Sequence, residues 1–218
     1  MNRNPLLTTA AAALLAIATQ AQAVTINFET LAAGTVLSNQ FAGLGVTFTP
    51  NAFSGTTPTP PTAQGWATNT DMTVVSSTGT DVGGLGTPLL VSGNILRSFD
   101  GWLGESGSPS FAAVFSTPVN TFSATFAGVT EFASTRLFVY NGATLLSTVA
   151  GADTGVAPAQ FILSFAAPSI TRVVITPGTF SDWVGVDNIV FQPVPEPATW
   201  GLMALGLAGL LILKRRRS

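Results

Sequence analysis

The sequence contains no cysteine and no histidine among its 218 residues. Without cysteine the protein has no disulfide bond, no thiol nucleophile and no thiolate metal site. Without histidine it also lacks the commonest general base and zinc ligand. These two absences exclude most hydrolase mechanisms and leave only chemistry that is based on carboxylates.

Charged residues are scarce as well, at 8% of the chain. Half of the eight basic residues stand together at the C-terminus, and Arg3 lies near the N-terminus. The region between the chain ends has nine acidic residues and three arginines, which leaves it with about six negative charges. This balance argues against a nucleic-acid partner. It fits either the attraction of cations such as calcium or solubility alone.

The N-terminus has the pattern of a secretory signal peptide. Arg3 provides a positive start, and residues 6–18 form an apolar stretch. Ala21 and Ala23 then occupy the two small positions of a cleavage site. We therefore predict that residues 1–23 are removed by a cut after Ala23. The alternative is a buried N-terminal helix.

A second apolar segment, residues 198–213, precedes the C-terminal basic cluster. As a helix it would be about 24 Å long, slightly shorter than the ~30 Å hydrocarbon core of a membrane. Trp200 suits one interface and the basic side chains can reach the other, so a single transmembrane helix is predicted. A soluble amphipathic helix is disfavoured because residues 201–213 have no polar face. The tail 214–218, which contains the four basic residues, is expected in the cytoplasm.

Residues 194–197, Val-Pro-Glu-Pro, stand directly before this apolar segment and form an extended linker. The Pro-Glu-Pro tripeptide within these residues, the apolar segment and the basic tail together resemble the PEP-CTERM sorting signal of Gram-negative bacteria. The matching residues are Pro195, Glu196 and Pro197 in the tripeptide and Lys214, Arg215, Arg216 and Arg217 in the tail.

This resemblance implies recognition by an exosortase, a membrane-embedded enzyme similar to cysteine proteases. It also implies export through the inner membrane, transient anchoring there, and a final place at the cell surface or outside. The bacteria concerned make extracellular polysaccharide, biofilm or flocs. The predicted organisation is therefore a signal peptide at 1–23, an extracytoplasmic domain at 24–193 and a sorting signal at 194–218.

The central region shows the two-residue periodicity of strands rather than a helical period. In residues 121–126 apolar side chains alternate with hydroxyl groups, as in a half-buried strand. Residues 136–140 and 144–149 flank Asn141-Gly142, which predicts a β-hairpin. Many short strands joined by turns predict an all-β, antiparallel sandwich or barrel. Further strands are expected at 24–28, 46–49, 72–75, 111–115, 161–165, 172–176 and 186–191.

Two segments of the central region are predicted to be long loops. Residues 51–69 are rich in Pro, Thr and Gly, and residues 82–110 are rich in Gly around a short apolar piece. Loops of this length in a compact domain are either functional or disordered.

The strand pattern resembles the galactose-binding-like jelly rolls of carbohydrate-binding modules and of many PEP-CTERM passenger domains. The matching pieces are residues 26–29, 137–142 and 186–191. The resemblance implies a jelly-roll-like β-sandwich in which a glutamate near the start and an aspartate near the end often hold a structural calcium. Glu29 and Asp187 stand at these two positions, and hard oxygen ligands suit calcium. Alternatively, Glu29 is a surface carboxylate and Asp187 makes local backbone bonds in a turn.

Three tryptophans of the central region are candidate platforms for a sugar ring, because an exposed indole stacks on sugars while nearby polar groups hold the hydroxyls. Trp102 lies close to Asp100, and Trp183 follows Asp182 directly. The third is Trp66. The alternative is that these rings are buried against the core.

We expect a non-catalytic binding module that associates with extracellular polysaccharide or biofilm matrix. One alternative is a structural matrix protein without a specific ligand. Another is a glycan hydrolase, which would need two carboxylates that converge on one substrate. The candidates for such a pair are Glu29, Glu105, Glu131, Asp182 and Asp187.

Overall fold

The computed structural model describes residues 22–49, 52–54, 62–65, 72–78, 84–97, 110–178 and 184–194. Nearly all of them belong to one compact unit, Ala23–Val194. The predicted sorting tripeptide and the apolar segment after it lie outside the described residues, as does the signal peptide apart from its last two positions. Within the part of the chain that is described, no helix is long and apolar enough to cross a membrane.

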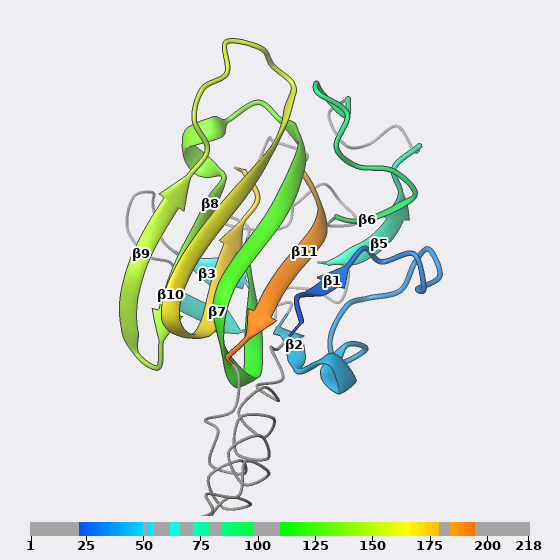
Figure 1. Ribbon diagram of the computed structural model, residues 1–218. Coiled ribbons are helices and arrows are strands. Elements are labelled where there is room, and N and C mark those ends of the chain that lie inside the picture. Colours follow the sequence, from blue (N-terminus) through cyan, green and yellow to red (C-terminus); the bar gives the residue numbers. More distant parts are fainter. Residues whose placement is uncertain are drawn as a thin grey trace, which may run out of the picture. The chain divides into compact units, whose positions relative to one another are not determined.

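The described part is built from β-strands and two short 3-10 helices (Figure 1). All paired strands are antiparallel, and β-sheet dominates, so the all-β prediction is confirmed. The strands are β1 (Val24–Ile26), β2 (Val46–Thr49), β3 (Ala52–Ser54), β4 (Thr62–Gly65), β5 (Thr73–Ser76), β6 (Asn94–Arg97), β7 (Phe111–Val129), β8 (Arg136–Asn141), β9 (Thr144–Ala150), β10 (Ala159–Thr176) and β11 (Gly185–Pro193). The 3-10 helices are η2 (Ala42–Leu44) and η3 (Phe132–Ser134).

The main sheet has nine strands, and β3 and β4 form a separate pair. The strand order in the main sheet is β5-β6-β11-β7-β10-β8-β9, with β1 also paired to β11 and β2 also paired to β7. The longest strands, β7 and β10, have 19 and 18 residues. Residues 112–115 of β7 pair with β2, whereas residues 119–127 pair with β11. The strand β7 thus joins two parts of the sheet that have different neighbours, while β10 pairs with β7 along most of its length and with β8 over residues 172–176.

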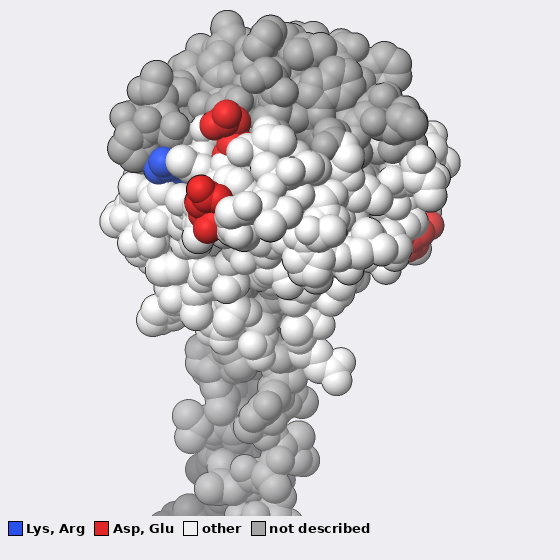
Figure 2. All heavy atoms as spheres, turned by 90° about the horizontal axis from the view of Figure 1, so that it is seen from above, with Lys and Arg blue, Asp and Glu red and all other residues white. Residues whose placement is uncertain are grey.

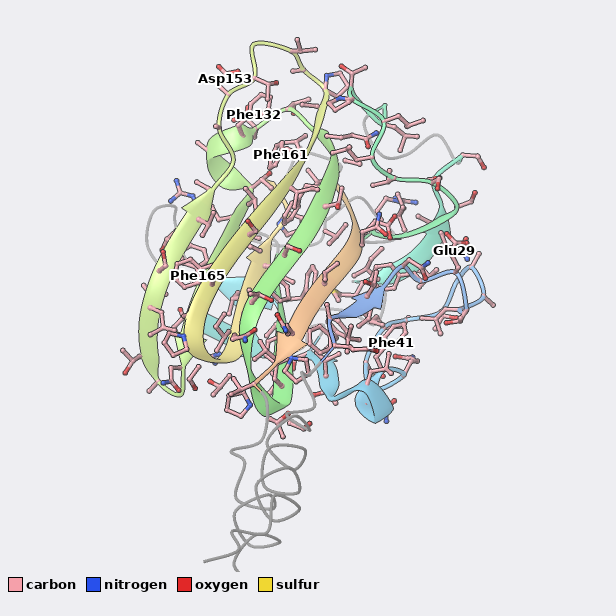
Figure 3. All side chains as sticks on the ribbon, viewed as in Figure 1. Glu29, Phe41, Phe132, Asp153, Phe161 and Phe165 are labelled. Carbon is pink, nitrogen blue, oxygen red and sulfur yellow. The ribbon has the colours of Figure 1, made fainter. Side chains whose placement is uncertain are left out.

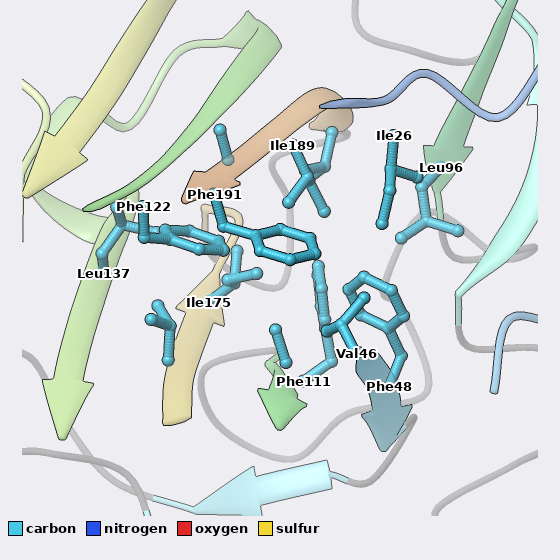
Figure 4. Close-up of a cluster of buried hydrophobic side chains, with 14 of the residues drawn as sticks. Ile26, Val46, Phe48, Leu96, Phe111, Phe122, Leu137, Ile175, Ile189 and Phe191 are labelled. Carbon is cyan, nitrogen blue, oxygen red and sulfur yellow. The ribbon is translucent and has the colours of Figure 1, made fainter. Parts of the chain in front are cut away.

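The buried faces of the strands enclose an aromatic core (Figure 4). Alternation along β7 turns Phe122 and Phe126 inward, where both rings are buried. Phe191 of β11 lies in the same cluster, with its ring centroid 5.1 Å from that of Phe115. Burial of each such ring contributes about 1.5–3 kcal/mol relative to exposure. This core fixes the register of β7 against β11, because a shift by one residue would turn the rings outward.

The predicted β8–β9 hairpin is confirmed, and Gly142 has the positive φ of 57° that its turn requires. The loop predictions were wrong in part. Residues 51–69 contain strands β3 and β4, and residues 82–110 contain β6. The side chains of Ile95 and Leu96 in β6 are fully buried. With two adjacent apolar residues in only four positions, β6 lacks the alternation by which strands are recognised.

Candidate functional site

The first and last strands of the domain, β1 and β11, lie side by side and pair Val24 with Phe191 and Ile26 with Ile189. Beyond these pairs, the chain after β1 reaches Glu29, and β11 leads back to Asp187. The pairing therefore brings together two carboxylates that are far apart in the sequence. They are close enough that the charge of Glu29 raises the pKa of Asp187.

Asp187 is 2% exposed. Its Oδ1 accepts a hydrogen bond of 2.6 Å from the backbone N–H of Asn188, and its Oδ2 accepts one of 3.3 Å from Asn188 Nδ2. Asn188 has a positive φ of 46°, and the β11 register shifts between Asp187 and Val190. Burial raises the pKa of Asp187 to about 7, with the charge of Glu29 as a smaller cause, while the bond from Asn188 lowers it.

Glu29 joins the end of β1 to the start of β6. Its Oε1 accepts a hydrogen bond of 2.9 Å from the backbone N–H of Asn94, whose own Nδ2 donates to the carbonyl oxygen of Leu31 at 3.0 Å. Gly93 has a φ of +71°, and a Cβ atom placed on it would collide with the Glu29 carboxylate. Another residue here would be strained by this φ, and its Cβ would displace the Glu29 carboxylate from its present position.

A third side chain, Gln160 of β10, holds the segment that lies between these carboxylates in the sequence. It is 2% exposed. Its Oε1 accepts hydrogen bonds from the backbone N–H groups of Leu90 at 2.6 Å and Val91 at 3.1 Å, and its Nε2 donates to Gly86 at 3.2 Å. The Leu90 carbonyl in turn accepts a bond of 3.4 Å from Asn188 Nδ2. Residues 86–94 are thus fixed by Gln160 at one end and by Glu29 at the other.

Sequence reasoning did not identify Gln160, Gly93 or Asn188 as parts of this corner. A glutamine at the start of a strand looks the same whether it faces solvent or a folded loop. Only the positive φ values of Gly93 and Asn188 have a weak signal in the sequence, because glycine and asparagine are the residues that adopt them most easily.

The corner offers oxygen atoms of the kind that hard cations prefer, namely two carboxylates and the Leu90 carbonyl. Among the described residues, no three Asp, Glu, His or Cys side chains gather into one cluster. A cation held here would therefore complete its ligands with carbonyl and water oxygens. Figure 2 shows that the described residues on one face are mainly uncharged, with acidic and basic groups near each other on one side and an acidic group at the opposite edge.

Of the predicted site residues, the structure brings together Glu29 and Asp187. Ala23 is exposed directly before β1. The remaining ones lie outside the described residues: Trp66, Trp102, Trp183, Asp100, Asp182, Ala21, Pro195, Glu196, Pro197, Lys214, Arg215, Arg216 and Arg217.

The end of the domain leads directly into a segment with a known relative. Residues 193–217 match the PEP-CTERM protein-sorting motif. The chain carries a PEP-CTERM sorting signal. This signal marks proteins that depend on an exosortase, are exported across the inner membrane, are anchored there transiently and are then released to the cell surface or outside. The match begins at Pro193, the last residue of β11, so the matched segment starts where the sheet ends.

Comparison with curated proteins found no sequence match. Among solved structures, the chain is similar to the K2 adhesin domain of Lys-gingipain, with a TM-score of 0.44, 14% identity, and coverage of 78% of this chain and 99% of that one. The K1 adhesin domain from Porphyromonas gingivalis W83 gives a TM-score of 0.41, 12% identity, and coverage of 79% and 98%. A family 6 carbohydrate-binding module gives a TM-score of 0.28, 20% identity, and coverage of 56% and 94%.

Proposed function

We propose that this protein is an exosortase-processed, non-catalytic binding module that associates with extracellular polysaccharide or biofilm matrix. The observation that carries the proposal is the sorting signal at residues 193–217, which directs the domain to the cell surface or beyond. Polysaccharide is proposed as the ligand because the resemblance to this class of sorting signal implies bacteria that make extracellular polysaccharide. We also propose that the sheet, in which β7 pairs first with β2 and then with β11, is a jelly-roll-like sandwich.

The composition supports binding over catalysis. The chain has neither histidine nor cysteine, so a hydrolase would have to rely on two carboxylates that act on one bond. Glu29 and Asp187 are the described carboxylates that lie close together. The burial of Asp187 and its bonds to Asn188 favour a role in holding the corner rather than in attack on a substrate.

Cosedimentation of the mature protein with extracellular polysaccharide tests this proposal. Trp102→Ala and Trp183→Ala are expected to weaken binding at least about tenfold each, which corresponds to ~1.4 kcal/mol. Leu146→Ala, at an exposed site on β9, is the control and should bind as the parent does. Unchanged binding in both tryptophan variants would remove the sugar platform from the proposal.

Cosedimentation, together with a measurement of released sugar, separates the alternatives. A protein that never sediments with polysaccharide would be a structural matrix component. Release of sugar that stops in Glu105→Gln or Asp182→Asn would instead identify a glycan hydrolase.

We propose in addition that a structural calcium ion binds between Glu29 and Asp187. Two observations support this proposal: the charge of Glu29 acts on Asp187, and Asn188, which bonds to Asp187, also donates to the Leu90 carbonyl, an oxygen that could complete the ligands. The ion would neutralise two negative charges that otherwise repel each other, and it would tie β1 and β11 to residues 86–94.

A further inference from the structure

The fold determines how far the domain can move from a membrane to which its tail is attached. Pro193 pairs with Val119 of β7, and the backbone N–H of Val194 donates a hydrogen bond of 3.0 Å to the Pro118 carbonyl. The chain is therefore held by the sheet up to Val194. Only residues 195–197 separate this point from the apolar segment that begins at residue 198.

This tether is short. Even a fully extended chain advances at most about 3.6 Å per residue, so Val194 stays within about 14 Å of residue 198. The polar layer on each side of a bilayer is itself several ångströms thick, roughly 5–8 Å. As long as the tail is attached, the end of the domain that contains Val194 would therefore lie at the membrane surface.

The surface at this end of the domain exposes apolar side chains among uncharged polar ones. Gly45 accepts hydrogen bonds from Ser116 N at 2.9 Å and from Ser116 Oγ at 3.3 Å, which places η2 beside the same stretch of β7 that holds Val194. Leu44, the last residue of η2, is 48% exposed, and Val194 is 36% exposed. A shallow groove of about 160 Å³ lies between η2, β2 and β7, and Val114 lines part of it.

The segments that form η2, β2 and this part of β7 and β11 also contain no charged residue, and Arg172 of β10 pairs with Val114 at the edge of the groove. Residues 39–49, 114–120 and 188–194 contain no Asp, Glu, Lys or Arg. A surface of uncharged segments with protruding Leu and Val side chains suits the boundary between lipid headgroups and acyl chains. Such a contact can be weak in itself, because a short tether gives it an effective concentration in the millimolar range.

We propose that the surface formed by η2, residues 116–118 and Val194 rests on the lipid bilayer while the sorting tail is attached. This inference depends on the proposed membrane anchoring by residues 198–213. Leu44 enters the headgroup region, and the opposite end of the domain, where Asp153 is labelled in Figure 3, points into the aqueous compartment. Removal of the tail abolishes the contact, because the remaining apolar area is too small to bind a membrane alone.

Site-specific fluorescence tests this arrangement, since the chain has no cysteine and any introduced one is unique. The full chain carrying Leu44→Cys is labelled with a polarity-sensitive fluorophore and reconstituted into vesicles of phosphatidylethanolamine and phosphatidylglycerol. Val156→Cys is the matched control, because Val156 is 53% exposed in the connection between β9 and β10 that also contains Asp153. Lipids with a quencher near the headgroup should quench the probe at position 44 at least about twofold more than the probe at 156.

Two further measurements make the outcome decisive. A flexible Gly-Ser linker of about 12 residues inserted after Val194, which reaches roughly 20 Å, should reduce the quenching at position 44 toward that at 156. Vesicle flotation reports the anchor separately. Protein that floats but shows equal quenching at both positions overturns the surface contact alone. Protein that does not float overturns the membrane anchoring and the contact with it.

Discussion

The carboxylates of Glu29 and Asp187 come from opposite ends of the domain sequence and lie within reach of each other's charge, because β1 pairs with β11. Both are fixed by backbone N–H groups, from Asn94 and Asn188 respectively. Two neighbouring negative charges, one of them buried, are unfavourable unless a proton or a cation compensates them. This relationship leads to two predictions that concern the same pair.

Calcium should raise the melting temperature of the domain. At a calcium concentration about 100 times the dissociation constant, binding to the folded state adds about 2.7 kcal/mol. For a domain of this size each kcal/mol corresponds to an increase of about 2–4 °C. Thermal melts with calcium and with a chelator measure the difference.

Glu29→Gln and Asp187→Asn should each lose this response. Asp153→Asn should keep it, because Asp153 is an exposed residue whose Oδ1 accepts a local bond from Gly155 N. Identical melting curves with calcium and chelator in the parent protein would show that no calcium binds at the corner.

The protein without calcium should become less stable as the pH rises from about 4 to about 7. The pKa of Asp187 is near 7 in the folded state and about 3.9 in an unfolded chain. Between these values the folded state binds more protons, so the free energy of unfolding falls with pH and levels off above 7. The total decline is on the order of 4 kcal/mol, since one pKa unit corresponds to about 1.4 kcal/mol.

Urea unfolding in chelator across this pH range measures the decline. Asp187→Asn has no proton to bind there, so its curve should lack the contribution from this residue. Saturating calcium should cancel the decline in the parent, because the cation stabilises the ionised carboxylate. A parent curve that matches Asp187→Asn at every pH would contradict the burial-driven shift.

The sequence was informative where the chain alternates and where turns have strong preferences. The β8–β9 hairpin was predicted from Asn141-Gly142 and the flanking periodicity. Residues 111–115 and 121–126 were predicted as separate strands, yet they are parts of one strand, β7. The residues between them, including Pro118, interrupt the alternation, and it is the pairing with β10, which reaches both Ala113 and Phe122, that shows the strand to continue.

The candidate site could be predicted only in its two carboxylates. Glu29 and Asp187 were singled out through a resemblance to jelly-roll domains. In the structure, the pairing of β1 with β11 brings the two residues near each other. The role of Gln160 depends on a loop that folds across β10, and nothing near Gln160 in the sequence encodes that loop's path. Long-range contacts of this kind are set by tertiary packing, so periodicity and turn chemistry cannot reveal them.

Gly93→Ala should destabilise the domain more than an ordinary glycine substitution does. A side chain at a φ of +71° is strained, and its Cβ would also collide with the Glu29 carboxylate. Strain of this kind costs about 1–3 kcal/mol, and displacement of Glu29 from the Asn94 N–H adds to it. Gly34→Ala is the matched control, because Gly34 has a φ of +88° and a Cβ atom added there would meet nothing within 4 Å. Equal losses of unfolding free energy in the two variants would show that the collision has no effect.

Gln160→Ala should loosen residues 86–91 and lower the free energy of unfolding by about 2–4 kcal/mol, because buried N–H groups that lose their acceptor cost about 1–3 kcal/mol each. The affected groups are the backbone N–H of Leu90 and Val91, which both donate to Gln160 Oε1. Their hydrogen exchange should accelerate, while exchange in the β8–β9 hairpin stays as in the parent.

Ser164→Ala, at an exposed position of the same strand, should leave both the stability and the exchange unchanged. Gln160→Glu separates the two halves of the contact, since it keeps an acceptor for Leu90 and Val91 but loses the donor to Gly86. If exchange at Leu90 and Val91 were as slow in Gln160→Ala as in the parent, the loop would be held by packing rather than by this side chain.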